Sequence, residues 1–297
     1  MSAAAIPLKF QVGARTLVAI PRRLVRVAYA LTDVLASADP ALPPLEERAH
    51  GYLVTSLPGA LLPALARRGM ITFVRQHYTR YFVDLAVGEG AWRAALSGQM
   101  RSTLKRKAKK LAQANGGTLD IRGYRAAEEV AAFHLLARAV SATTYQERLL
   151  DSGLPADPGK LIARAAADEV RAWLLFLDDA PIAYLCCQAV GTTLRYDFVG
   201  HDPAYGALSP GTVLMERALG DLFGDRFAAF DFTEGEGQHK RGFATGGVAC
   251  CDVLLLRPTV VNRATVAAIG GFDALMAMAK RWSEMPALNC LAKRVRR

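Results

Sequence analysis

Five side chains that could exchange protons or bind anions lie close together at the end of an apolar run at 227–232. They are Asp231, Glu234, Glu236, His239 and Lys240. Carboxylate and imidazole groups are the usual general bases of enzymes, and imidazole titrates near neutral pH. The alternative is structural: the acids cap the turn after the strand, and Lys240 pairs with one of them. The cluster therefore indicates acid–base chemistry and leaves the structural alternative open.

A second candidate site precedes this cluster in the chain. Ser209 and Pro210 predict the start of a helix at 211–223, because serine caps helices and proline is favoured at the first helical position. The first turn of a helix has unpaired backbone N–H groups and a partial positive charge, which together bind anions. Gly211 would let a phosphate approach the backbone closely. The motif from Ser209 to Thr212 therefore indicates an anion-binding site.

The densest cationic run lies in a helical pattern that begins at Gly90 and ends at Gly116-Gly117. The run consists of Arg101, Lys105, Arg106, Lys107, Lys109 and Lys110. It is either a solvated helix face or a docking surface for the phosphates of RNA, for lipid head groups or for an acidic protein. No aromatic residue lies within the run, which disfavours base stacking on single-stranded nucleic acid.

Strands and helices alternate in a clear order after this run. The predicted strands lie at 118–124, 171–177, 180–190, 193–199, 227–232 and 249–256. The predicted helices lie at 126–142, 158–168, 211–223 and within 234–243, and a loop lies at 201–209. Asp178-Asp179 and Gly191 are hairpin punctuation between three of the strands. Residues 8–75 indicate mixed α/β structure with helical spacing at 58–68, and the residues after 260 indicate one or two peripheral helices with a basic tail.

Four blocks of residues lie at the loops of this series. They are His201-Asp202-Pro203-Ala204-Tyr205, Ser209-Pro210-Gly211-Thr212-Val213-Leu214, Phe230-Asp231-Phe232-Thr233 and Gly235-Glu236-Gly237-Gln238-His239-Lys240-Arg241-Gly242-Phe243. With the order of elements, they resemble the GNAT acyltransferases, an α/β fold with a mixed, largely antiparallel sheet flanked by helices. More specifically, 196–243 is similar to acetyltransferases associated with cellulose biosynthesis and, more distantly, to Fem-type aminoacyl transferases. The resemblance covers residues 78–258.

The resemblance implies direct transfer of an acetyl or longer acyl group from a thioester, usually of coenzyme A, to an amine. It places the pyrophosphate of the donor on Ser209, Gly211, Thr212, Val213 and Leu214. It places the pantetheine arm in a gap between the strands around 196–199 and 230–232. It also implies catalytic residues among Asp231, Glu234, Glu236 and His239, with Glu236 or His239 as proton acceptor. Substrate contacts are expected from Lys240, Tyr196 and Tyr205. Acyl-CoA would be a co-substrate for a small-molecule or sugar amine, and no permanently bound cofactor is expected.

Other donors and another class of function stay open. The helix start has a short Ser-Pro-Gly form instead of the glycine-rich loop usual in the family, so an acyl carrier protein or an aminoacyl-tRNA could replace coenzyme A. A tRNA donor would make the chain a Fem-like transferase, with the run at 101–110 as its RNA contact. A non-catalytic GNAT-like module would instead dock on an anionic membrane surface or an acidic protein. The formal net charge of +10 suits each of these anionic partners.

Composition excludes several classes of protein. The chain has 297 residues, of which 52% are apolar and 22% charged, so it can bury a core. No uninterrupted apolar stretch reaches the length of a spanning helix, and no secretory signal is visible, so a cytoplasmic enzyme is expected. Two adjacent cysteine pairs and one single cysteine, without a CxxC motif, predict buried thiols and no metal site. The abundance of alanine and arginine favours a bacterial source.

The domains predicted from these patterns are three continuous segments. Residues 1–117 are expected to form a mixed α/β half that ends in the basic helix and could be a degenerate GNAT-like copy. Residues 118–258 are expected to form the acyltransferase domain, and residues 259–297 a helical basic tail. A tandem of two GNAT-like halves would place the active site at their interface.

Overall fold

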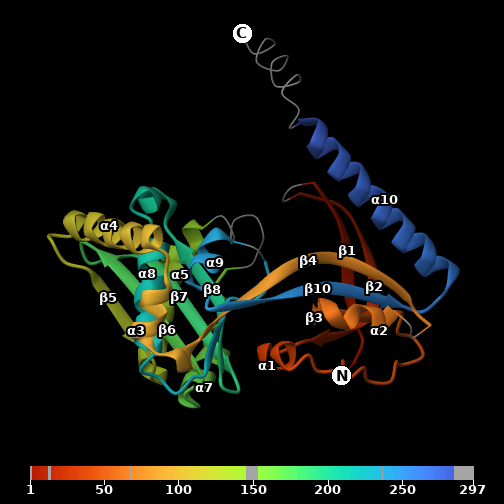
Figure 1. The fold of residues 1–297 in the computed structure, drawn as a ribbon, viewed down its shortest axis with the longest axis horizontal. Helices are drawn as coiled ribbons and strands as arrows, with labels where there is room; N and C mark the ends of the chain where they lie inside the picture. Colours follow the sequence, from red (N-terminus) through yellow and green to blue (C-terminus); the bar gives the residue numbers. More distant parts are fainter. Residues whose placement is uncertain (1, 13–14, 67–68, 145–152, 236, 284–297) are drawn as a thin grey trace, which may run out of the picture. The chain divides into compact units, whose positions relative to one another are not determined.

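The computed structural model describes residues 2–12, 15–66, 69–144, 153–235 and 237–283, which fall into two compact units (Figure 1). The first unit comprises Met1–Tyr29, Ser37–His77 and Cys251–Arg297, and the second comprises Ala30–Ala36 and Tyr78–Cys250. Mixed α/β structure with a largely antiparallel sheet confirms the predicted fold class. The units are discontinuous in sequence, whereas the predicted domains 1–117, 118–258 and 259–297 are continuous. The boundaries of those three domains stay predictions.

The second unit is built on a sheet with the strand order β4-β9-β8-β7-β6-β5. Its strands are β4 (Ile71–Asp84), β5 (Asp120–Tyr124), β6 (Val170–Leu177), β7 (Ala180–Val190), β8 (Thr193–His201) and β9 (Ala229–Asp231). The β8–β9 pair is parallel, and the other neighbours in this order are antiparallel. The positive φ angles of Asp178, Asp179 and Gly191 turn the chain between β6, β7 and β8, as the sequence predicts.

The second unit also contains helices, several of which cover the two faces of this sheet. They are α1 (Leu31–Leu35), η2 (Leu85–Val87), α3 (Glu89–Ala95), α4 (Gly98–Ala114), α5 (Ala127–Thr143), α7 (Gly159–Ala166), η3 (Pro203–Leu208), α8 (Pro210–Leu222) and α9 (Gln238–Phe243). Side chains alternate across a strand, so Trp173 and Leu175 pack with α3, α4 and α8, whereas Ala172 and Leu174 pack with α5 and α7. Strand β6 is therefore buried along its whole length.

Two local predictions around the helices are corrected. The helical pattern from Gly90 forms two helices, because the Ser97 side chain accepts a hydrogen bond from the Met100 N–H (3.1 Å) and starts α4 afresh. Ser209 does not cap α8 with its side chain; it adopts a left-handed conformation (φ 55°, ψ 48°) between η3 and α8. Pro210 is at the first position of α8, as predicted. The loop expected at 201–209 contains η3.

The first unit has the strand order β1-β2-β3-β10-β4. Its elements are β1 (Ala4–Val12), β2 (Arg15–Ala28), β3 (Gly51–Pro58), η1 (Gly59–Leu61), α2 (Leu62–Ala66), β10 (Gly246–Leu256) and α10 (Val260–Ser283). Strands β1 and β2 form an antiparallel hairpin, and β2 pairs with β3 in parallel. The buried side chain of Asp252 joins the strands by accepting hydrogen bonds from the Ser56 N–H (2.9 Å) and Gln76 Nε2 (2.7 Å).

Helix α10 contains one stretch, Val260–Ala279, that is long and apolar enough to cross a membrane by length and composition alone. Only 17% of that stretch is buried. Arg263 and Asp273 interrupt it, which explains why a search for uninterrupted apolar residues overlooks it.

An ion-pair network in the second unit predicts acid sensitivity. Asp168 bonds Arg125 (2.6 Å), and Arg171 bonds Asp168 (2.8 Å) and Asp225 (2.5 Å). The bond from Arg125 lowers the pKa of Asp168. Burial opposes the shift at Asp225, but the bond from Arg171 leaves the pKa of that carboxyl lowered as well. Carboxylates with lowered pKa values stabilise the fold above their unfolded-state pKa, and this stability is lost as the pH falls.

We expect the Asp225→Asn variant to lose about 1–3 kcal/mol of unfolding free energy at pH 7, because it removes one of the two carboxylates that pair with the buried Arg171. The difference from the unmodified protein should shrink once the pH falls below about 4, where the carboxylate begins to be protonated in the unfolded chain. Urea unfolding at several pH values, followed by tryptophan fluorescence, measures both quantities. A difference that stays constant down to pH 3 would contradict the assignment.

Candidate active site

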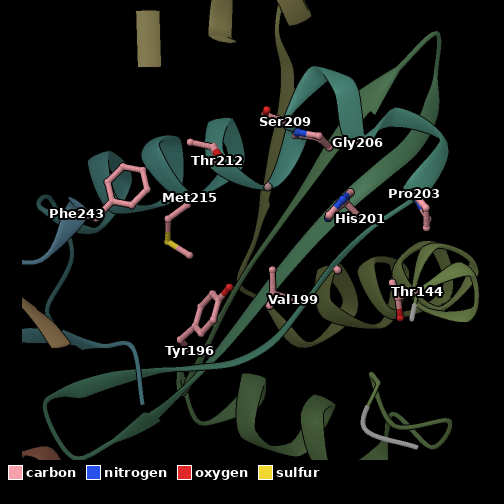
Figure 2. Close-up of a pocket in the computed structure, with 13 residues that line it drawn as sticks. Thr144, Tyr196, Val199, His201, Pro203, Gly206, Ser209, Thr212, Met215 and Phe243 are labelled. Atoms are coloured by element: carbon pink, nitrogen blue, oxygen red, sulfur yellow. The ribbon is translucent and has the colours of Figure 1, made fainter. Parts of the chain in front are cut away.

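A pocket of about 610 Å³ lies in the second unit, beside the end of β8 and the start of α8 (Figure 2). Its lining residues come from β8, η3, α8, α9 and the end of α5. They are Thr144, Tyr196, Val199, Gly200, His201, Pro203, Gly206, Ser209, Pro210, Gly211, Thr212, Met215 and Phe243. A volume of this size is in the range of sites that hold small organic ligands.

The pocket exists because β8 and β9 separate. The two strands pair in parallel over three residues, ending at Arg195 and Asp231, after which β9 stops and β8 continues to His201. A register shift at Cys186/Cys187 places Tyr196 opposite Cys187 and Phe198 opposite Cys186. This bulge lies where the strands separate, and bulges next to active sites commonly re-aim a side chain. The gap therefore begins at Tyr196.

Tyr196 is the polar side chain best fixed in the pocket. Its ring packs edge-on against Phe230 and Phe232, with centroids 6.2 and 6.0 Å away, and the Lys240 ammonium lies 5.9 Å from its centroid. The hydroxyl points into the space between Met215 and Val199 (Figure 2). Burial raises the pKa of Tyr196, so the hydroxyl stays protonated near neutral pH and can donate a hydrogen bond.

The start of α8 forms one wall of the pocket. Ser209, Gly211 and Thr212 line it, as expected for the predicted anion site. A Cβ atom added to Gly211 would meet no atom within 4 Å, so the backbone there is open to a ligand. Val213 and Leu214 are buried in the core, and their side chains are not among the lining residues. The N–H groups of Thr212 and Val213 donate to the Ser209 carbonyl oxygen, so what the helix start offers a phosphate is the open backbone at Gly211 and a partial positive charge.

Helix α4 places two lysines beside this helix start. Lys107 Nζ donates to Thr212 Oγ1 (3.1 Å), and Lys110 Nζ donates to the carbonyl oxygen of Ala207 in η3 (3.0 Å). Leu104 and Leu111 are buried on the same helix and hold α4 in place. The predicted anion site and the cationic run are therefore parts of one positively charged surface.

The remaining cations of the run have different surroundings. Arg101 donates to the carbonyl oxygens of Ala94 (2.9 Å) and Leu96 (2.6 Å), where α3 ends, and so satisfies carbonyls that a helix C-terminus leaves unpaired. Lys105, Arg106 and Lys109 are exposed. The run divides into one structural arginine, two lysines at the pocket and three exposed cations.

Asp231 is fully buried and supports the end of β9. Its carboxylate accepts hydrogen bonds from Arg80 Nε (3.1 Å) and Arg80 Nη2 (2.5 Å), and from the Thr233 N–H (2.8 Å). Burial opposes the charge on Arg80, but the bond to Asp231 leaves the pKa of the guanidinium raised. Arg80 and the Thr233 N–H thus occupy the carboxylate, and the catalytic role suggested by the sequence stays a prediction.

We expect Asp231→Ala to destabilise the second unit by about 3–5 kcal/mol, because it removes the buried carboxylate that pairs with the Arg80 guanidinium. Chemical denaturation compared with the unmodified protein measures the change. The double variant Arg80→Met/Asp231→Leu is the control, since removing both charges together should recover a large part of the loss. A single variant as stable as the unmodified protein would show that the pair is not structural.

Lys240 is buried beside the same strand end. Its ammonium donates to the backbone carbonyl oxygens of Phe232 (2.9 Å) and Glu234 (2.7 Å). Burial lowers the pKa of Lys240. These bonds tie α9 to the segment after β9 and hold the ammonium near Tyr196, and the predicted contact of Lys240 with substrate stays a prediction.

The other residues predicted for the site either do not line the pocket or have side chains that the structure does not describe. Glu234 is exposed, and Tyr205 lies in η3, where it packs against the core and is not among the lining residues. Glu236 lies outside the described residues, and of His239 the structure describes the backbone, which belongs to α9. Phe243, at the end of α9, lines the pocket, so α9 ends at the site.

Several lining residues were not predicted from the sequence. Met215 and Thr144 belong to none of the quoted motifs, and His201 and Phe243 belong to two of them without having been given a role at the site; the fold brings the four together from four elements. Gly200 has a physical reason to be glycine: an added Cβ would lie 2.6 Å from Tyr184 Cε1 and 2.8 Å from Thr144 Cγ2. Its absent side chain is what lets α5 approach β8.

Among the residues that the structure describes, we find no candidate metal site and no exposed thiol. The described His, Cys, Asp and Glu residues form no group of three that could hold a metal ion. Cys186, Cys187, Cys250 and Cys251 are buried free thiols, as predicted. Burial raises the pKa of Cys186 and of Cys187, which makes them unreactive.

Comparison with known families decides what kind of domain this is. Residues 98–241, from the start of α4 into α9, match a family model described as an acetyltransferase (GNAT) domain. Residues 98–241 form a GNAT-type domain within the second unit. The match includes the cationic helix α4 and the whole α8 start. It does not single out the acetyltransferases associated with cellulose biosynthesis, so that finer resemblance stays a prediction.

Solved structures align with the chain at low sequence identity. The C-terminal domain (DUF2156) of a protein from Agrobacterium fabrum, described as a lysylphosphatidylglycerol synthetase, aligns with a TM-score of 0.52 at 13% identity, over 75% of this chain and 72% of that one. FemX aligns with a TM-score of 0.48 at 10% identity, over 86% and 88%. A GCN5-related N-acetyltransferase from Kribbella flavida aligns with a TM-score of 0.39 at 14% identity, over 72% and 70%. No curated protein matches the chain by sequence.

Proposed function

We propose that the GNAT domain transfers an acyl group from a coenzyme A thioester to an amine. The observation that carries the proposal is the pair of lysines from α4 that lies over the open start of α8. Lys107 and Lys110 bond to Thr212 and Ala207, which flank Gly211 on either side. A pyrophosphate at Gly211 would meet the open helix start and two ammonium groups, which together match its charge.

The pantetheine arm would follow β8 from the helix start to Tyr196. The lining residues between these two points include Val199, Gly200 and Met215, which are apolar and suit an uncharged arm. The thioester would then lie where β8 and β9 separate, beside the Tyr196 hydroxyl. The proposal thus divides the pocket into a phosphate end at α8 and a reaction end at Tyr196.

The reaction is an acyl transfer without a covalent enzyme intermediate. The amine nitrogen attacks the thioester carbonyl carbon, a C–N bond forms, and the C–S bond breaks. Tyr196 donates a hydrogen bond, and then its proton, to the departing thiolate, since burial keeps the hydroxyl protonated until that charge develops. The attacking nitrogen loses its proton to an acceptor carried by or next to α9, for which Glu236 and His239 are the candidates.

We propose that His201 contributes to the binding of the acyl donor and takes no part in the acyl-transfer step. Along an extended strand, the five steps from Tyr196 to His201 span roughly 16 Å, which puts the imidazole near the phosphate end of the pocket. His201→Ala should therefore raise KM for acetyl-CoA by about threefold to tenfold and leave kcat within about twofold.

The variants His239→Ala and Glu236→Gln, which each remove one candidate proton acceptor, are compared with His201→Ala. Loss of the proton acceptor should lower kcat by about 100-fold and remove the acidic limb of the pH–rate profile. Steady-state kinetics of the three variants between pH 6 and 9 separate the roles. A large fall in kcat for His201→Ala, with both α9 variants unchanged, would overturn the assignment.

A thiol-release assay tests the activity itself. The purified chain is mixed with acetyl-CoA and a panel of small-molecule and sugar amines, and free coenzyme A is measured. We expect at least one amine to accelerate release. Lys107→Ala/Lys110→Ala should raise KM for acetyl-CoA by about tenfold or more, whereas Lys105→Ala/Lys109→Ala, which removes the same charge from exposed positions, should change it little. No release above background with any amine would contradict a coenzyme A donor.

A second candidate donor is aminoacyl-tRNA, and one observation favours it. Lys105, Arg106 and Lys109 are exposed on the helix that supplies the two pocket lysines, so a longer polyanion could continue along α4. Binding that neutralises several phosphates falls steeply with salt, whereas one coenzyme A molecule depends on salt less. Affinity measured at two salt concentrations therefore distinguishes the donors.

A further inference from the structure

The first unit exposes large apolar side chains on two of its elements. Val12 (46% exposed) and Val18 (56%) lie near the connecting end of the β1–β2 hairpin, and Leu275 (52%) and Met278 (46%) lie in the second half of α10. These four residues are called the apolar end below. Leu17, also in β2, is 52% exposed.

Helix α10 packs along the hairpin and ends beside this region. Arg22 of β2 donates a hydrogen bond to Thr265, and farther along the helix Phe272 packs edge-on against Phe10 with ring centroids 5.3 Å apart. Ile269, between these two contacts, is buried. The helix therefore runs toward the connecting end of the hairpin, as the ribbon shows (Figure 1).

Strand register puts the exposed valines on the side of the hairpin that faces α10. Phe10 pairs with Val18, so the two side chains share a face of the hairpin. The pairing shifts register after Phe10, where Gln11 pairs with Thr16, and along β1 itself the alternation of side chains places Val12 on the same face as Phe10. Because Phe10 contacts Phe272, the four residues of the apolar end lie around one side of the unit.

The outward side of α10 is apolar over most of its length. Its exposed residues between Val260 and Ala279 include Val260, Val261, Ala264, Ala267, Ala268, Gly271, Ala274, Leu275, Ala277, Met278 and Ala279. Arg263 and Asp273 are the two charged residues of this stretch, and Asp273 pairs with Arg75 (3.6 Å). A helix face of this kind is typical of a surface that meets lipid or another apolar surface.

Positive charge gathers in the sequence next to the apolar end. From residue 274 to the last residue, the chain has six Lys or Arg residues and one Glu. Lys9 of β1 is also exposed. Basic residues that follow an apolar helix face are attracted to anionic lipid head groups, and each contributes about 1 kcal/mol near such a surface. The same charge would oppose the close approach of a second copy of this chain.

We infer that the first unit docks on the surface of an anionic lipid bilayer through the apolar end and the outward side of α10. The helix lies on the bilayer and does not cross it. The opposite side of α10 is committed to the protein, through the Thr265 bond and the Phe272 contact, and Asn262 Nδ2 donates to the carbonyl oxygen of Arg257 (3.0 Å). Crossing the bilayer would break these contacts.

Flotation with lipid vesicles tests the inference on the full chain. One vesicle type contains phosphatidylcholine alone, and the other contains phosphatidylcholine with 30 mol% phosphatidylglycerol. We expect the protein to float with the anionic vesicles, at least tenfold more than with neutral ones, and to be released by high salt but not to need detergent. Leu275→Glu/Met278→Glu should reduce binding to the anionic vesicles at least tenfold.

The matched control is Leu119→Glu/Leu135→Glu, which adds the same charge at two exposed leucines of the second unit and should bind vesicles as the unmodified protein does. Circular dichroism confirms that both double variants are folded. Equal binding by both double variants, or no preference for anionic vesicles, would overturn the inference. Retention on vesicles through both high salt and carbonate at high pH would also overturn it, in favour of a crossing helix. So would loss of self-association instead of lipid binding in Leu275→Glu/Met278→Glu, measured by light scattering, in favour of a second copy.

Discussion

Glutamate in place of Gly211 is expected to weaken acetyl-CoA binding by about 100-fold or more. Position 211 lies in the first turn of α8, where a phosphate would meet the backbone and the ammonium groups of Lys107 and Lys110. A carboxylate a few ångströms from a phosphate repels it by on the order of 3 kcal/mol at the effective dielectric of a protein surface. The glutamate carboxylate would also interact with the partial positive charge of the helix start in place of the phosphate. Calorimetric titration of the variant measures the loss.

Gly211→Ala is the matched control for this prediction. An added Cβ meets no atom within 4 Å, so alanine fits without displacing its neighbours and should leave the affinity within about threefold. Equal losses in the alanine and glutamate variants would show that the glycine is needed for the backbone. Unchanged binding in the glutamate variant would place the phosphates elsewhere.

Phenylalanine in place of Tyr196 is expected to lower kcat by about 100-fold to 1,000-fold, with KM for acetyl-CoA changed less than about threefold. The variant keeps the ring between Phe230 and Phe232 and removes only the hydroxyl that is proposed to protonate the departing thiolate. Steady-state thiol release measures both constants.

A thioester with a better leaving group is the control for the role of Tyr196. If the hydroxyl protonates the thiolate, a more acidic thiol should need it less, so the deficit of Tyr196→Phe should shrink with such a donor. A deficit that is the same for both donors would assign the hydroxyl to positioning. A variant with unchanged kcat would remove Tyr196 from the chemistry.

Most of the second unit could be predicted because its signals are local. The strands β6, β7 and β8 are apolar runs separated by Asp178-Asp179 and Gly191, and those turns form as expected. The break between α3 and α4 was missed, because Ser97 is a common residue whose capping role depends on the chain direction that follows it. Helix and strand types thus follow from short-range patterns, and boundaries depend on individual caps.

The site could be predicted only in part, because its contacts join distant parts of the chain. The start of α8 was found from its own sequence, but its partner Lys107 lies 105 residues away, and no spacing rule connects the two. Arg80 and Asp231 are 151 residues apart in the sequence. The sequence therefore showed an acidic residue near the end of a strand, but it did not show that an arginine pairs with this carboxylate. Tyr196 was expected to contact substrate by resemblance, and the strand separation beside it supplies the physical reason.

Calorimetric titration of the unmodified protein with acetyl-CoA, at low and at moderate salt, tests the central claim most directly. The account predicts saturable one-to-one binding at both salt concentrations, with only a modest loss of affinity at the higher one, because a single pyrophosphate is bound by Lys107, Lys110 and the start of α8. Absence of binding at both salt concentrations would contradict a coenzyme A donor and would turn the search to carrier-protein and tRNA thioester or ester donors.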